Sequence, residues 1–151
     1  MQMFPQRLLV VEDDVTVARA LSRTLARVGF SVAVARSCRA AIALSQSFDF
    51  AILDLDLPDG KGVDLARTLL ASGRLPSVLF FTSSTDPVLL ARARCLGSVI
   101  SKSLGTSPVL NYLAALTPEH AAPPQSRTMP STQVRSYRAP ASSSLHRSRA
   151  R

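Results

Sequence analysis

The chain has 151 residues, enough for one ordinary domain but too few for two domains with separate cores. Apolar residues make up 46% of it and aromatic residues only 5%, and the net charge of +8 is uneven, with +3 on residues 1–117 and +5 on residues 118–151. No apolar run approaches the roughly 18–20 residues of a membrane helix, and no secretory signal opens the chain, so we expect a soluble cytoplasmic protein with no membrane segment.

In the first third of the chain, short apolar runs alternate with helical patterns. Residues 8–11 are four apolar residues that stop abruptly at acidic side chains, as a buried strand does at its carboxyl end. Apolar positions then recur every three or four residues over 15–28, which predicts a helix. We expect a second strand over 30–35, a helix that Ser37 caps and that ends near residue 45, and a third strand over 50–53.

The alternation continues to about residue 117. Pro, Asp and Gly at 58–62 are typical of a turn, and Asp86-Pro87 is a favourable helix start. The further elements expected are a helix from Val63 that Gly73 ends, a strand over 78–81, a helix from Pro87, a strand over 98–101 and a helix over 108–116.

Strands that alternate with helices predict an α/β domain, namely a doubly wound, flavodoxin-like sheet of five parallel strands with helices on both faces. We place this domain at residues 6–117. Residues 118–151 are rich in Pro, Ser and Arg and lack any apolar period, so we expect a disordered basic tail.

Polar side chains follow four of the five expected strands. In a parallel sheet of order 2-1-3-4-5 these strand ends are neighbours, so the side chains would converge. Carboxylates so close together repel one another, and a hard divalent cation such as Mg²⁺ would relieve that repulsion. The residues at the strand ends are Glu12, Asp13, Asp14, Asp54, Asp56, Thr82, Ser83 and Lys102.

This pattern resembles the receiver domain of bacterial response regulators over about residues 6–117. The resemblance is carried by Glu12-Asp13 after the first strand, the segment 54–60 (DLDLPDG), Thr82 after the fourth strand and Lys102 after the fifth. Each feature alone is common in proteins. Their order and their placement at successive strand ends make the resemblance specific.

The resemblance implies that Asp54 is a phosphoacceptor, which takes a phosphoryl group from a histidine kinase or a phosphotransfer protein. Lys102 and the hydroxyl of Thr82 would contact the phosphoryl oxygens. Such a domain is not an enzyme in the usual sense, and it would signal through a downstream protein effector. Mg²⁺ would be the cofactor, and its ligands would be Glu12, Asp13, Asp54 and the backbone carbonyl of Asp56.

Three positions depart from the family pattern. Ser103 follows the lysine where the family usually has proline, and Val99 occupies the position of the switch aromatic. The stretch before the lysine is also about two residues short, with Gly97 only five residues ahead of it. These changes keep open a second interpretation, a phosphorylation-independent scaffold with the shape of a receiver.

A haloacid-dehalogenase-like phosphatase is a weaker alternative. Asp54 and Asp56 would serve as its nucleophile and acid, Thr82 or Ser83 as its hydroxyl and Lys102 as its lysine. That family places acidic residues after the lysine, and here the only one is Glu119.

The remaining residues give little sign of chemistry. Cys38 and Cys95 have no metal-binding or redox spacing, so we expect both to be small buried residues. Residues 118–151 are too short for a helix-turn-helix domain, so DNA binding is not expected from this chain. The six tail arginines would attract nucleic acid only non-specifically.

Overall fold

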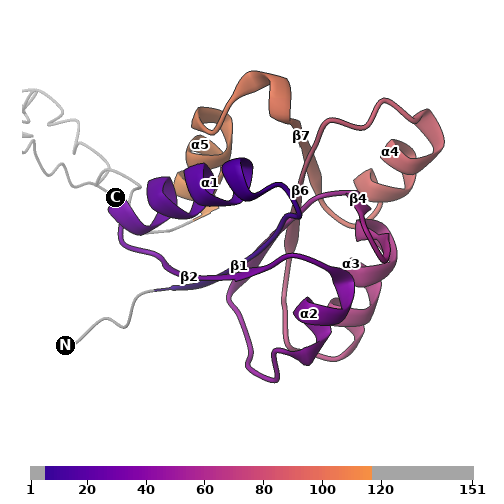
Figure 1. Cartoon of the computed structure of the whole chain (residues 1–151), viewed down its shortest axis with the longest axis horizontal. Coiled ribbons are helices and arrows are strands. Elements are labelled where there is room, and N and C mark those ends of the chain that lie inside the picture. Colours follow the sequence, from indigo (N-terminus) through magenta and orange to yellow (C-terminus); the bar gives the residue numbers. More distant parts are fainter. Residues whose placement is uncertain (1–5, 117–151) are drawn as a thin grey trace, which may run out of the picture. The chain divides into compact units, whose positions relative to one another are not determined.

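The computed structural model describes residues 6–116. Within them, five parallel strands form one sheet in the order β2-β1-β3-β6-β7, which confirms the predicted order 2-1-3-4-5 (Figure 1). The strands are β1 (Arg7–Val11), β2 (Ser31–Ala35), β3 (Phe50–Leu53), β6 (Val78–Thr82) and β7 (Ser98–Ser101).

Helices cover both faces of this sheet. α1 and α5 lie together on one face, and α2, α3 and α4 lie on the other (Figure 1). Successive side chains of a strand point to opposite faces of the sheet. Leu8 and Val10 therefore pack toward α1 and α5, while Leu9 and Val11 pack toward the other three helices. The helices are α1 (Val15–Arg27), α2 (Cys38–Ala43), α3 (Gly62–Ala71), α4 (Pro87–Arg94) and α5 (Ser107–Leu116), with a short 3₁₀ turn η1 (Lys102–Leu104).

Side-chain caps fix where three of these helices begin. Asp14 accepts the amides of Thr16 and Val17, Ser37 accepts the amide of Ala40, and Asp86 accepts two amides of α4 directly before Pro87. The predicted cap at Ser37 and the predicted start at Asp86-Pro87 are therefore confirmed.

The predicted turn at 58–62 contains more order than its composition indicated. Two short strands, β4 (Asp56–Leu57) and β5 (Gly60–Lys61), pair antiparallel and form a hairpin whose tip is Pro58-Asp59. Two-residue strands leave no period in a sequence, so only the turn at their centre could be predicted.

Two other expectations need correction. Helix α2 ends at Ala43 rather than near residue 45, because Leu44 has extended backbone and its carbonyl accepts the guanidinium of Arg74. Cys38 is half-buried and Cys95 is exposed at the end of α4, so the prediction that both are buried is wrong.

The boundary after residue 117 and the predicted disordered tail lie outside the described residues and stay predictions. Within residues 6–116, no helix combines the length and the apolar character needed to cross a membrane.

Candidate functional site

Three carboxylates meet where β1 and β3 end. Glu12 and Asp13 follow β1, Asp54 follows β3, and one ligand oxygen from each lies within 4.8 Å of the others. The two strands are neighbours in the sheet. One further backbone hydrogen bond, from the amide of Asp54 to the carbonyl of Val11 at 2.9 Å, joins them just beyond the end of β3. The predicted convergence of these carboxylates is therefore present.

Lys102 supplies the positive charge of this cluster. Its Nζ lies 2.6 Å from Oε2 of Glu12 and 2.6 Å from Oδ2 of Asp54. The side chains of Glu12, Asp54 and Lys102 are only 3%, 8% and 15% exposed, so one ammonium bridges two carboxylates with little help from water. The lysine reaches the cluster from η1, directly after β7.

Burial and this pairing shift two pKa values. Burial raises the pKa of Glu12, and the charge of Asp54 adds to that effect, while hydrogen bonds from Lys102 and from the amide of Asp14 oppose it. Burial alone would lower the pKa of Lys102, but its hydrogen bonds to Asp54 and Glu12 and their negative charges together raise it. Lys102 is therefore firmly protonated at neutral pH.

The backbone around Asp54 is held from two directions. Oδ1 of Asp54 accepts the amide of Leu55 at 2.7 Å, and the carbonyl of Leu55 accepts the amide of Gly62 at 2.8 Å. A Cβ on Gly62 would stand 1.9 Å from the carbonyl oxygen of Asp54, so only glycine lets α3 begin this close to the site. In the sequence, Gly62 looks like any other residue of a turn.

Two other predicted site residues lie at the same edge of the sheet. Thr82 ends β6, the strand beside β3, and is 2% exposed, and its Oγ1 accepts the amide of Ser84 at 3.0 Å. The side chain of Asp56 is half exposed and pairs with Lys61 at 2.5 Å, away from the three-carboxylate cluster. Only the carbonyl of Asp56 was predicted as a ligand, and that role stays a prediction.

The two other polar residues at these strand ends have different environments. Asp14 caps α1, and its own amide donates to Oε1 of Glu12 at 3.1 Å. Ser83 is exposed. Asp14 thus orients one of the site carboxylates through its backbone, and its side chain belongs to the helix.

The three departures from the family pattern have structural counterparts. The amide of Ser103, which a proline would lack, donates at 3.3 Å to the hydroxyl of Ser101, the residue that caps the start of η1. Val99 is half-buried against the core between the sheet and α4. The short connection from α4 to β7 runs close to the backbone of β6 at Gly97. A Cβ at this position would lie 2.2 Å from the carbonyl oxygen of Val78, so the connection needs glycine there.

Sequence reasoning missed two residues that hold the loops around the site. Asp59, taken for a simple turn residue, accepts the amides of Cys38 and Arg39 at 2.7 and 2.9 Å and so ties the hairpin to the start of α2. Arg36 donates to the carbonyl of Asp13 at 3.0 Å. These contacts join residues 20 to 23 positions apart in the sequence, so no local sequence pattern predicts them.

The donor set fits Mg²⁺. Glu12, Asp13 and Asp54 offer hard carboxylate oxygens, the ligand type that Mg²⁺ prefers, and Asp13 is exposed to solvent while the other two are buried. The ammonium of Lys102 offsets part of the negative charge of Glu12 and Asp54. The acidic pocket is therefore compatible with Mg²⁺.

Comparison with known proteins supports the receiver interpretation rather than the scaffold or the phosphatase. Residues 8–112 match the family described as response regulator receiver domain. The chain is similar to the "DNA-binding response regulator MtrA" of Mycolicibacterium paratuberculosis, with 38% identity over 85 residues, or 55% of this chain and 37% of MtrA. It thus spans well under half the length of that relative.

Solved structures show the same fold. The non-phosphorylated HemR receiver domain from Leptospira biflexa has 30% identity and a TM-score of 0.67, over 74% of this chain and 93% of that one. The chemotaxis response regulator CheY4 of Vibrio cholerae has 22% identity and a TM-score of 0.66, over 75% and 99% of the two chains. On the strength of the family match, the strand order and the acidic pocket, the chain belongs to the response regulator receiver domain family of two-component signalling.

Proposed function

We propose that Asp54 is the phosphoacceptor of this receiver and that a phosphohistidine on a histidine kinase or a phosphotransfer protein is the donor. A carboxylate oxygen of Asp54 attacks phosphorus, the bond from phosphorus to the histidine nitrogen breaks, and the nitrogen keeps the electron pair and takes a proton from water. The product is an acyl phosphate on Asp54. This self-modification is the only chemistry that we assign to the domain.

The observation that carries the proposal is the double contact of Lys102. The ammonium lies 2.6 Å from Asp54 as well as from Glu12, which supports Asp54 as an acceptor because a cation already stands beside its carboxylate. After transfer, Asp54 would carry about −1.5 to −2 charges, and the protonated Lys102 is the nearest group able to pair with the new oxygens.

Glu12, Asp13, Asp54 and the carbonyl of Asp56 would hold Mg²⁺. When bound, the ion would neutralise charge on the phosphoryl oxygens and orient them. Thr82 would donate its hydroxyl to a phosphoryl oxygen from the end of β6. These assignments rest on the position of each residue at one edge of the sheet.

The output of the domain also belongs to this proposal. With Val99 at the position of the family's switch aromatic, no large ring is available there to report phosphorylation. We propose that the change is small and is carried by Thr82 and η1 to a protein effector. DNA contact by the described domain is not part of the proposal, and the expected cytoplasmic location stays a prediction.

Acetyl phosphate with Mg²⁺ tests the proposal without a cognate kinase. Wild type should gain one phosphoryl group by intact-mass measurement, and Asp54→Asn should gain none. Asp56→Asn, two residues away and on the exposed hairpin, is the matched control and should still be labelled. Equal labelling of Asp54→Asn and wild type would exclude Asp54.

A further inference from the structure

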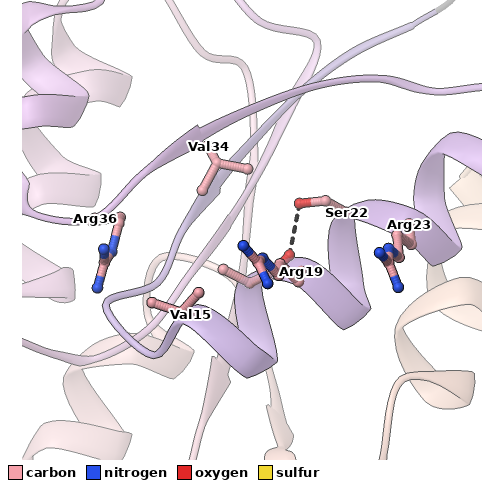
Figure 2. A pocket seen from close by; sticks show the side chains of 7 residues that line it. Val15, Arg19, Ser22, Arg23, Val34 and Arg36 are labelled. Carbon is pink, nitrogen blue, oxygen red and sulfur yellow. Dashed lines mark hydrogen bonds between the residues drawn. The ribbon is translucent and has the colours of Figure 1, made fainter.

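A groove separate from the acidic pocket runs between α1 and the edge strand β2. Its apolar floor consists of Val15, Ala18 and Val34, and its volume is about 320 Å³. Val15 and Val34 are 42% and 43% exposed, so water reaches apolar surface that a folded domain usually covers. The hydroxyl of Ser22 points back to the carbonyl of Ala18 at 2.7 Å and is already satisfied (Figure 2).

Three arginines border this floor. Arg19 and Arg23 come from successive turns of α1, and Arg36 follows β2 (Figure 2). All three are exposed, and none forms an ion pair with a carboxylate within residues 6–116, where the paired cations are Lys61, Arg92 and Lys102.

The sequence of α1 strengthens this charge asymmetry. The helix holds three arginines, the third being Arg27, and no acidic residue. Arginines four residues apart lie on one face of a helix and repel one another. A negatively charged occupant would relieve that repulsion, and each guanidinium can hold a carboxylate through two parallel hydrogen bonds.

We propose that the groove binds an acidic amphipathic segment of a protein partner, with aliphatic side chains on Val15, Ala18 and Val34 and carboxylates on Arg19, Arg23 and Arg36. Nucleic acid fits less well, because single strands stack their bases on aromatic side chains and the groove has none. A membrane surface fits less well, because the apolar residues form the floor of a hollow and do not protrude into lipid.

Occupancy of the groove does not require the phosphoacceptor. Arg36 reaches the carbonyl of Asp13, but the groove is lined by other residues than those of the acidic cluster. The variant Asp54→Asn should therefore bind the same segment as wild type. Loss of phosphorylation and loss of groove binding can thus be told apart in one set of proteins.

The probe is a fluorescent helical peptide with leucines on one face and glutamates on the other. Its anisotropy is titrated with the full chain at about 0.15 M salt. Arg19→Ala/Arg23→Ala should weaken binding at least tenfold. Arg67→Ala/Arg94→Ala removes the same charge from exposed positions on α3 and α4 and should leave the affinity within twofold of wild type.

A second pair of variants, one in the groove and one outside it, tests the apolar floor. Val34→Ser should weaken peptide binding severalfold, whereas Val88→Ser, at a valine 68% exposed on α4, should not change it. A peptide of the same composition with leucines and glutamates scrambled should bind at least fivefold more weakly than the amphipathic one.

Several results would overturn the proposal. These are no binding of the amphipathic peptide, equal losses in the two double arginine variants, or an unchanged affinity in Val34→Ser. Tighter binding of a single-stranded oligonucleotide or of anionic phosphatidylserine vesicles, abolished by Arg19→Ala/Arg23→Ala, would assign the groove to nucleic acid or to lipid instead.

Discussion

Lys102 forms ion pairs with two buried carboxylates, and we expect these pairs to contribute to the free energy of unfolding. Without the ammonium, Glu12 and Asp54 would face each other across a few ångströms of poorly hydrated space. Removing one partner of a buried ion pair is costly because the remaining charges stay buried and unpaired. The pair of Lys61 and Asp56 offers a comparison, because both of its side chains are about half exposed.

We predict that Lys102→Met lowers the free energy of unfolding by about 3 kcal/mol in the absence of Mg²⁺. Lys61→Met should lower it far less, since water already solvates both charges of that pair. Urea denaturation of the two variants at neutral pH measures the difference. Equal losses would mean that Lys102 does not stabilise the cluster in solution.

Some residues of the site could be predicted from the sequence and others could not. Glu12, Asp13, Asp54 and Lys102 follow predicted strands, so they are expected to meet once the strands are placed in the order 2-1-3-4-5. The close approach of Gly62 to the carbonyl of Asp54 is different, because it depends on three-dimensional packing that composition does not encode.

The stability of helix α2 depends on the hydrogen bonds at its first turn. The helix has six residues, too few to be stable by helix propensity alone. Ser37 caps one amide of its first turn, and the carboxylate of Asp59 accepts two others. The Ser37 cap was predicted from the sequence, whereas Asp59 comes 20 residues after Arg39 and reaches α2 from the β4–β5 hairpin.

This arrangement makes α2 sensitive to acid. The amides of Arg39 and Cys38 lower the pKa of Asp59 below its usual 3.8. A group with a lowered folded-state pKa stabilises the fold fully above its unfolded-state pKa, and loses that contribution as pH falls through the folded value. The contribution of Asp59 should therefore be fully present at pH 6 and should be lost as the pH falls below 3.8 and through the lower folded-state pKa.

We predict that Asp59→Ala destabilises the domain at pH 6 and that its cost shrinks steadily below pH 4. Ser37→Ala removes a cap that does not titrate and should cost about 1 kcal/mol at both ends of this range. Urea denaturation across the pH series measures both costs. A cost for Asp59→Ala that does not change with pH would contradict the role of its ionised carboxylate.

The fold of residues 6–116 was predictable because its signals are local. Apolar runs and caps gave five strands and five helices, and the need to gather polar strand ends gave their order. The hairpin was not predictable because its two-residue strands leave no period in the sequence. The early end of α2 was not predictable because Leu44 is held by Arg74, 30 residues further along the chain. The exposure of Cys95 ran against the apolar character of cysteine. The tail, with its six arginines, lies outside the described residues.

The carboxylate cluster also links the stability of the domain to Mg²⁺. An ion that binds only the folded state stabilises it by mass action, by about 1.4 kcal/mol at ten times its dissociation constant. We predict that millimolar Mg²⁺ raises the melting temperature of wild type and that Asp13→Asn abolishes the rise. Asp14→Asn, which keeps a good helix cap beside the site, should retain it. The same rise in both variants would place the metal elsewhere.

Chemical mapping of the phosphoryl group tests most directly whether Asp54 carries it. After reaction with acetyl phosphate and Mg²⁺, borohydride reduces an aspartyl phosphate to homoserine, and peptide mass spectrometry locates the altered residue. The predicted result is homoserine at position 54 alone, with none in Asp54→Asn. Homoserine at position 13 or 56 in wild type, or none at all in a protein that has gained a phosphoryl group, would contradict it.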